Sequence, residues 1–356
     1  MKGFVVASIA VLCLSAHADK IDDLVRAEMN AGKIPGIAVA VIRDGKTTKM
    51  RGYGLANIEH NVPVKPETVF QSGSVGKQFT ATLAMMFVEE GKIKLNDPIT
   101  KYLTEGKDKW GGVTIKHLLS HTSGMSSMFY GRLDLRKDYS EDDLVKFWLE
   151  SEMVETPGQR WRYSNGGYVM LGVLLGRVGG KFYGDLLQDK IFKPLGMDTA
   201  RIISESDIVP NRSSGYMLRD GKLVHHEWVA PRLNTTADGS LHLTLRDYVK
   251  WDQALYTEKL LKADSLRQMW TPVKLNDGTT AVAMGGGYGF GWGVASQGGI
   301  EMIGHSGASQ GFTTWICRVP KKKTTVVVLG NLAEAKTDSL GLQILQSVLP
   351  ELKPKT

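Results

Sequence analysis

The chain has 356 residues of average composition, with 42% hydrophobic residues, a formal net charge of +7 and two cysteines. It contains no tandem repeat, low-complexity tract or flexible linker, which argues against solenoid and disordered classes. The positive residues are dispersed except at Lys321-Lys322-Lys323. There, Pro320 before them and a β-branched run after them predict a hairpin turn rather than a nucleic-acid site. The mildly basic charge favours contact with anionic cell-wall material.

The first residues have the pattern of a secretory signal. Met1-Lys2 precede an apolar run over 3–14, and the small-residue site Ala16-His17-Ala18 follows. This pattern predicts a signal peptide over residues 1–18 and a secreted or periplasmic protein. The apolar run is too short for a stable membrane anchor. One cysteine, Cys317, remains after cleavage, so we expect no internal disulfide and a buried packing role for that thiol.

The following elements predict an antiparallel sheet with a helical insertion. An amphipathic helix ends before Pro35, and two strand patterns over 37–42 and 47–53 flank Asp44-Gly45, as in a β-hairpin. Helical patterns dominate from 70 to about 261, after which strands return and a helix closes the chain over 339–349. We expect an α+β fold with one lobe from 19–69 and 265–356, and a mainly helical lobe from 70–264.

The first chemical motif is Ser74-Val75-Gly76-Lys77, at the start of a predicted apolar helix. Backbone N–H groups and the helix dipole favour negative charge there. Ser74 and Lys77 share one helix face, and a lysine whose pKa is lowered can take the proton of a serine hydroxyl. Taken alone, the motif fits a solvated lysine in an ordinary helix equally well.

The second motif is Tyr163-Ser164-Asn165, in a turn-rich loop that leads into a helix. A tyrosine acts as a base only where a cation stabilises its phenolate, and Lys77 is the candidate cation. Asn165 has both a donor and an acceptor, which suits it to hold Lys77 and a substrate together. The alternative is a packed tyrosine beside a helix-capping asparagine.

The third motif is His305-Ser306-Gly307-Ala308, on a predicted edge strand that turns into a second strand. Small residues there let a substrate backbone lie close. We expect the backbone N–H groups of Ala308 and Ser74 to form an oxyanion hole, with His305, Ser306 and Gly307 in substrate binding. The alternative places His305 on the surface of an ordinary strand.

In this order the motifs resemble the Ser-x-x-Lys, Tyr-x-Asn and Lys-Thr-Gly motifs of serine β-lactamases and penicillin-binding DD-peptidases. The likeness is strongest to class C β-lactamases and to family VIII esterases and D-amino-acid peptidases. It extends from about Asp22 to Val348, through stretches that include 115–124, 194–197 and 288–292. One departure is His305, where the lactamases usually carry lysine. A mostly neutral imidazole shifts the expectation from β-lactams towards esters, amides or D-amino peptides.

Two other patterns indicate different chemistry, but their contexts argue against it. Residues 307–311 match the Gly-x-Ser-x-Gly elbow around Ser309, yet a strand pattern follows where the elbow needs a helix. His117 and His121 have helical metal-ligand spacing without the glutamate of a metalloprotease motif. We expect these histidines to form local hydrogen bonds.

The residues therefore predict a two-step acyl-enzyme reaction that needs no cofactor or metal. Ser74, deprotonated through Lys77 and Tyr163, attacks a carbonyl carbon, and water activated through Tyr163 releases the acid. The substrate is a small ester, amide or peptide. The alternative is a catalytically silent penicillin-recognising sensor or scaffold that keeps the fold and loses deacylation.

Overall fold

The computed structural model describes residues 12–127, 133–283 and 285–353. It begins in helix α1 (Leu12–Gly32), which ends before Pro35 as expected. Part of the predicted signal peptide, residues 1–11, lies outside the described residues, and the cleavage stays a prediction. Across the part of the chain that is described, no helix is both long and apolar enough to span a membrane.

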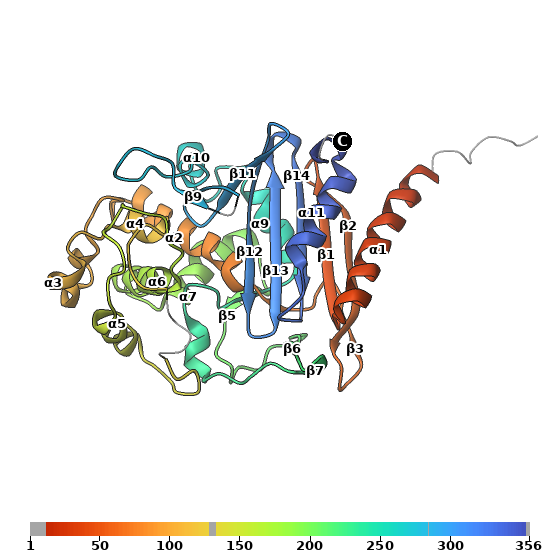
Figure 1. Ribbon diagram of the computed structural model, residues 1–356, viewed down its shortest axis with the longest axis horizontal. Coiled ribbons are helices and arrows are strands. Elements are labelled where there is room, and N and C mark those ends of the chain that lie inside the picture. The colour runs from red at the N-terminus through yellow and green to blue at the C-terminus, as the bar shows by residue number, and fades with distance from the viewer. Residues whose placement is uncertain (1–11, 128–132, 284, 354–356) are drawn as a thin grey trace, which may run out of the picture.

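The centre of the molecule is a nine-stranded antiparallel sheet in the order β3-β2-β1-β14-β13-β12-β11-β10-β9 (Figure 1). Its strands come from two ends of the sequence: β1 (Gly36–Arg43), β2 (Lys46–Asn57), β3 (Val62–Pro63), β9 (Val282–Ala283), β10 (Gly286–Tyr288), β11 (Gly293–Gln297), β12 (Ile300–Ser309), β13 (Phe312–Val319) and β14 (Thr324–Gly330). The β1–β2 hairpin turns at Asp44 and Gly45, which both have positive φ, as the sequence predicts. Lys321–Lys323 lie in the predicted turn between β13 and β14.

Both faces of this sheet are covered, so its central strands are continuous apolar runs. In β1, Ala38 and Ala40 face one core, whereas Val39 and Val41 face the other. The second core also contains Ile21 and Val25 of α1, together with residues of the C-terminal helix α11 (Thr337–Val348). Figure 1 shows α1 and α11 beside the sheet, whereas most of the inserted helices lie to the left of β12.

The inserted segment is mainly helical, as expected. Its helices are α2 (Lys77–Glu89), α3 (Lys107–Trp110), α4 (Ile115–Leu119), α5 (Glu141–Glu150), α6 (Asn165–Gly179), α7 (Tyr183–Leu187), α8 (Lys193–Leu195), α9 (Leu245–Ala254) and α10 (Ala263–Met269). The segment also holds short strands that the sequence did not reveal, because two to four residues are too few for a periodic pattern. These strands are β4 (Phe70–Gln71), β5 (Arg201–Ile202), β6 (Tyr216–Arg219), β7 (Lys222–His225) and β8 (Leu241–Leu243).

The fold places the three motifs around one point. The short helical turn Gly73–Gly76 carries Ser74 between β4 and α2, and it packs against β12 and β13. Thr314 of β13 donates a hydrogen bond from its hydroxyl to the Ser72 carbonyl at 2.5 Å, which fixes this turn to the sheet. The serine therefore lies where the helical segment meets the β12 side of the sheet.

Candidate active site

Ser74 lies close to the backbone of β12. Gly73, just before it, has a φ of +50°, and a Cβ there would lie 2.5 Å from the Ala308 nitrogen. A Cβ on Gly307 would lie 2.9 Å from the Ser74 nitrogen. Only glycines permit this approach, because any side chain would clash with the facing backbone. The two N–H groups expected to hold an oxyanion therefore belong to backbones in direct contact.

Lys77 is completely buried and forms the hydrogen-bonding centre of the site. Its Nζ donates to Ser74 Oγ at 3.0 Å, to Asn165 Oδ1 at 2.9 Å and to the Asp238 backbone carbonyl at 2.5 Å. Burial lowers the pKa of Lys77 to about 8, and the Asp238 charge opposes this only partly. With this pKa, about a tenth of Lys77 is neutral at pH 7, and this neutral form can accept the serine proton.

Tyr163 presents its ring to Lys77, with Nζ 5.0 Å from the ring centroid, and Tyr168 lies similarly at 5.4 Å. The Tyr163 hydroxyl is buried, and none of the described residues gives it a well-formed hydrogen bond. Burial raises the pKa of Tyr163, while the nearby Ser74 side chain lowers it slightly. Because Lys77 loses its proton far more easily, the shifts favour Lys77 over Tyr163 as the first proton acceptor.

Asn165 is the first residue of α6, and its position follows from the local sequence. The helix is capped by Ser164, whose Oγ accepts from the Gly167 N–H at 3.1 Å. The asparagine is therefore free of the capping role and turns its amide oxygen to Lys77. Thus the structure brings together Ser74, Lys77 and Asn165 by direct hydrogen bonds.

The strand β12 differs from the expected edge strand. Residues 300–304 pair with β11, whereas residues 305–309 pair only with β13. The edge is thus local, and it begins at the third motif. Ala308 is exposed there, while Ser306 and Gly307 line the same cavity as Ser74.

His305 is buried rather than a surface residue, with 3% of its area exposed. Its Nδ1 lies 2.5 Å from the Ser306 carbonyl and its Nε2 lies 3.0 Å from the Tyr288 hydroxyl. These contacts fit a neutral ring that donates from Nδ1 and accepts at Nε2. Burial, together with the charge of Lys77, lowers the pKa of His305 to about 4. The third motif therefore supplies no cation at neutral pH.

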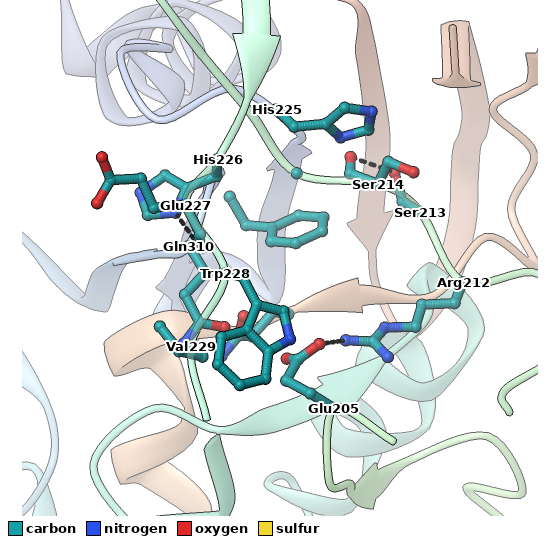
Figure 2. Close-up of a pocket in the computed structure, with 13 residues that line it drawn as sticks. Glu205, Arg212, Ser213, Ser214, His225, His226, Glu227, Trp228, Val229 and Gln310 are labelled. Carbon is teal, nitrogen blue, oxygen red and sulfur yellow. Dashed lines mark hydrogen bonds and ion pairs between the residues drawn. The ribbon is translucent and has the colours of Figure 1, made fainter. Parts of the chain in front are cut away.

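Several cavities adjoin this region. One of about 360 Å³ is lined by Ser74, Trp161, Tyr163 and the third motif. A larger one of about 470 Å³ lies beyond the β12–β13 turn, where Figure 2 shows Arg212 paired with Glu205 beside Trp228. Ser74 lines the smaller cavity and not the larger one. Ser74, together with Asn165 and Ala308, also lines a small cavity of about 50 Å³.

The competing patterns have other surroundings. Ser309 ends β12 and is followed by strand β13, so it is not on a nucleophile elbow. The His117 ring accepts from the Thr114 N–H at 3.2 Å within a capping box, which is a local bond as predicted. Among the residues that the structure describes, no group of three or more potential ligands could hold a metal ion.

Sequence reasoning did not identify three neighbours of the site. The Asp238 carbonyl binds Lys77 but leaves no mark in the sequence, because every residue has a carbonyl. Tyr288 of β10 is buried and bonds to His305, but in the sequence it stood out only within the family-like stretch 288–292. The His121 ring lies against the Tyr163 ring, at a centroid distance of 4.1 Å. The sequence singled out His121 only for its spacing from His117 and predicted a local hydrogen bond, which is wrong, because its ring accepts from the Ser164 N–H, 43 residues along the chain.

The chain belongs to the β-lactamase and penicillin-binding protein family and is class C-like, because the Beta-lactamase family model matches residues 21–347. Penicillin-binding protein 4* of Bacillus subtilis is 30% identical over 300 residues, which cover 79% of this chain and 65% of that protein. Unguisins hydrolase ungD' of Aspergillus campestris is 28% identical over 330 residues, or 87% of this chain and 60% of that protein. The chain thus spans less than two thirds of these relatives.

Two solved structures share the fold. The octameric penicillin-binding protein homologue from Pyrococcus abyssi superimposes with a TM-score of 0.83 at 30% identity, covering 94% of this chain and 77% of that one. The D-amino acid amidase from Ochrobactrum anthropi SV3 superimposes with a TM-score of 0.81 at 23% identity. The match covers 95% of this chain and 100% of the amidase chain. The expected α+β fold with terminal helices on an antiparallel sheet and a helical insertion is confirmed.

Proposed function

We propose that the protein is a serine hydrolase that forms an acyl-enzyme on Ser74 from short esters, D-amino amides or D-amino peptides. The observation that carries this proposal is the 3.0 Å contact between Ser74 Oγ and the buried Lys77 Nζ, whose pKa is lowered to about 8. A serine hydroxyl beside a partly neutral amine is an activated nucleophile. The name of the hydrolase among the relatives supports hydrolysis, and that of the amidase supports an amide substrate.

In the proposed reaction, neutral Lys77 takes the Ser74 proton as Oγ attacks the substrate carbonyl carbon. The Ser74 and Ala308 N–H groups hold the resulting oxyanion. The bond to the leaving alcohol or amine then breaks, and that group takes the proton from Lys77 through the Tyr163 hydroxyl. Water enters next and attacks the acyl carbon, and its proton passes through Tyr163 to Lys77. The bond between the acyl carbon and Ser74 Oγ then breaks, Oγ takes this proton back from Lys77, and the acid is released.

The neutral state of His305 carries the proposed substrate preference. A cation at this position would attract the carboxylate of a β-lactam, whereas a buried neutral ring gives no such attraction. Uncharged acyl substrates should therefore react faster than penicillins or cephalosporins. The lining of the 360 Å³ cavity, with Trp161 and Ala335 beside polar groups, fits a small acyl or leaving group.

Covalent labelling tests the proposal. Ser74→Ala should abolish labelling by a fluorescent penicillin or fluorophosphonate. Ser309→Ala is the matched control, because it changes the same side chain in the competing motif, and it should label normally. Loss of labelling in the Ser309 variant alone would overturn the assignment.

Turnover then separates an enzyme from a sensor or scaffold. The panel is a short p-nitrophenyl ester, a D-amino amide, a D-Ala-D-Ala peptide and a chromogenic cephalosporin. We expect repeated turnover of esters or D-amino compounds. A stoichiometric burst with no further product on every substrate would support the silent sensor instead.

A further inference from the structure

His121 holds the peptide groups on both sides of Tyr163. Its backbone carbonyl accepts from the Arg162 N–H at 2.8 Å, and its ring Nδ1 accepts from the Ser164 N–H at 3.1 Å. Arg162 and Ser164 are the immediate neighbours of the tyrosine in the chain. One residue therefore fixes the backbone from which the Tyr163 side chain extends.

The same histidine also covers the tyrosine ring. The two ring centroids are 4.1 Å apart with an interplanar angle of 33°, and the imidazole has 1% of its area exposed. Tyr168 and Tyr288 close the histidine in, at centroid distances of 5.1 and 4.9 Å. The phenol that faces Lys77 is thus restrained through its backbone and through one face of its ring.

The bond to Ser164 requires a neutral imidazole, because a protonated Nδ1 cannot accept. Burial keeps the pKa of His121 well below its usual value, and the charge of Lys77 acts in the same direction. The proton is then on Nε2, which has no hydrogen-bond partner among the described residues. The ring is therefore a fixed acceptor.

The backbone of His121 is held in an unusual conformation by its surroundings. Its φ of +58° lies in the left-handed region, which costs energy for most residues. The next residues secure the loop: the Thr122 carbonyl accepts from Gly158 at 2.7 Å and the Gly124 carbonyl from Val154 at 2.8 Å. Strain of this kind persists where neighbouring contacts determine the conformation.

We propose that His121 is a positioning residue for the acyl-transfer reaction, which acts by holding Tyr163 against Lys77 and Ser74. The inference rests on the proposed function of that site. It assigns His121 a role through Tyr163 and not through contact with substrate. Proton transfer depends on sub-ångström placement, so a loosened phenol should slow acylation even in a well-folded protein.

Two amide substitutions separate this role from simple packing. In His121→Asn, Oδ1 lies three bonds from Cα, as Nδ1 does, and asparagine tolerates positive φ. In His121→Gln the acceptor lies one bond further out and cannot replace Nδ1. We expect the Gln variant to lose about 10- to 100-fold in the labelling rate of Ser74, and the Asn variant less than about threefold. His117→Asn and His117→Gln are matched controls and should both label normally.

A double-mutant cycle of His121→Gln and Tyr163→Phe measures the coupling between the two residues, which a purely structural role of His121 would not produce. If His121 acts through the Tyr163 hydroxyl, His121→Gln should cost less than about threefold when it is combined with Tyr163→Phe. An equal cost in both backgrounds, or equal losses in the Asn and Gln variants, overturns the proposal. The fold of each variant is checked by thermal unfolding. If His121→Gln does not fold, a loss of more than about tenfold in the labelling rate of folded His121→Asn is enough to overturn the proposal.

The wild-type protein separates failure of this inference from failure of the proposed function. A wild type that is not labelled at Ser74 contradicts the function itself. Normal wild-type labelling with an unaffected His121→Gln variant contradicts only the role of His121. The proposed function and the role of His121 are both supported if the wild type labels normally, His121→Gln labels slowly and His121→Asn labels at nearly the wild-type rate.

Discussion

Two long cationic side chains, Lys77 and Arg318, are completely buried, and they differ in what surrounds them. Arg318 of β13 pairs with the buried Asp252 carboxylate of α9 at 2.7 Å and lies over the rings of Tyr256 and Trp270. Lys77 instead donates to a hydroxyl, an amide and a backbone carbonyl. Arginine stays charged in proteins, whereas lysine releases its proton when burial is not offset by a carboxylate.

The surroundings of each buried cation therefore determine whether it stabilises the fold or acts as a base. A buried pair such as Arg318 and Asp252 joins β13 to α9, and Thr325 donates a further bond to the same carboxylate at 2.7 Å. A buried amine with only neutral acceptors is costly to keep charged, and that cost is what makes it a base. Exchanging the surroundings of Lys77 and Arg318 tests whether they set these two roles.

The largest expected effect follows from removing the titratable amine. Lys77→Met should lower ester kcat/KM by about 10³-fold or more, because no group is left to take the Ser74 proton. Lys77→Arg should be as severe, since a guanidinium keeps the charge and cannot act as a base. Steady-state kinetics on protein of checked fold measures both. Activity of the Arg variant within about tenfold of wild type would show that charge alone is required.

A change in the Arg318–Asp252 pair should alter the stability of the fold and not the reaction at Ser74. Asp252→Asn leaves the Arg318 charge buried without its carboxylate and should lower the free energy of unfolding by about 3–5 kcal/mol. Asp264→Asn, which removes the carboxylate from the exposed pair with Arg267, is the control and should cost less than about 1 kcal/mol. Urea denaturation measures both variants. A loss for Asp252→Asn no greater than for the control would contradict the comparison.

The opposite test places a carboxylate beside Lys77, as Asp252 lies beside Arg318. Asn165→Asp should raise the pKa of Lys77, because a negative charge at 2.9 Å favours the ammonium. A higher pKa reduces the small neutral fraction of Lys77 further, and ester kcat/KM at pH 7 should fall about tenfold or more. Activity should recover towards about pH 10. A loss that is independent of pH would mean that Asn165 acts in binding only.

Much of this arrangement could be predicted from the sequence, because its signals are local. Asp44-Gly45 between two alternating runs specifies a hairpin, and Ser74 and Lys77 meet through helix geometry alone. The contact of His121 with Tyr163 joins two loops, and no local pattern encodes it. The inserted strands are also set by tertiary pairing, since β8 bridges β4 and β5.

A smaller effect is expected from restoring a cation at the third motif. His305→Lys should raise cephalosporin kcat/KM relative to ester kcat/KM by about fivefold, or about 1 kcal/mol, through attraction to the substrate carboxylate. The substitution also removes the bond to Tyr288, so the ratio within one variant is the useful quantity. A wild type that already prefers cephalosporins, with no gain in the variant, would show that His305 does not set the preference.

The pH dependence of Ser74 labelling shows whether Lys77 acts as a neutral base. With burial lowering its pKa to about 8, the unprotonated fraction grows as pH rises through 8. The labelling rate under limiting fluorophosphonate should therefore increase about 30-fold from about pH 6.5 to 9 and then level off, following one ionisation near 8. A rate that is flat across this range, or that keeps rising beyond about pH 10, would contradict the assignment.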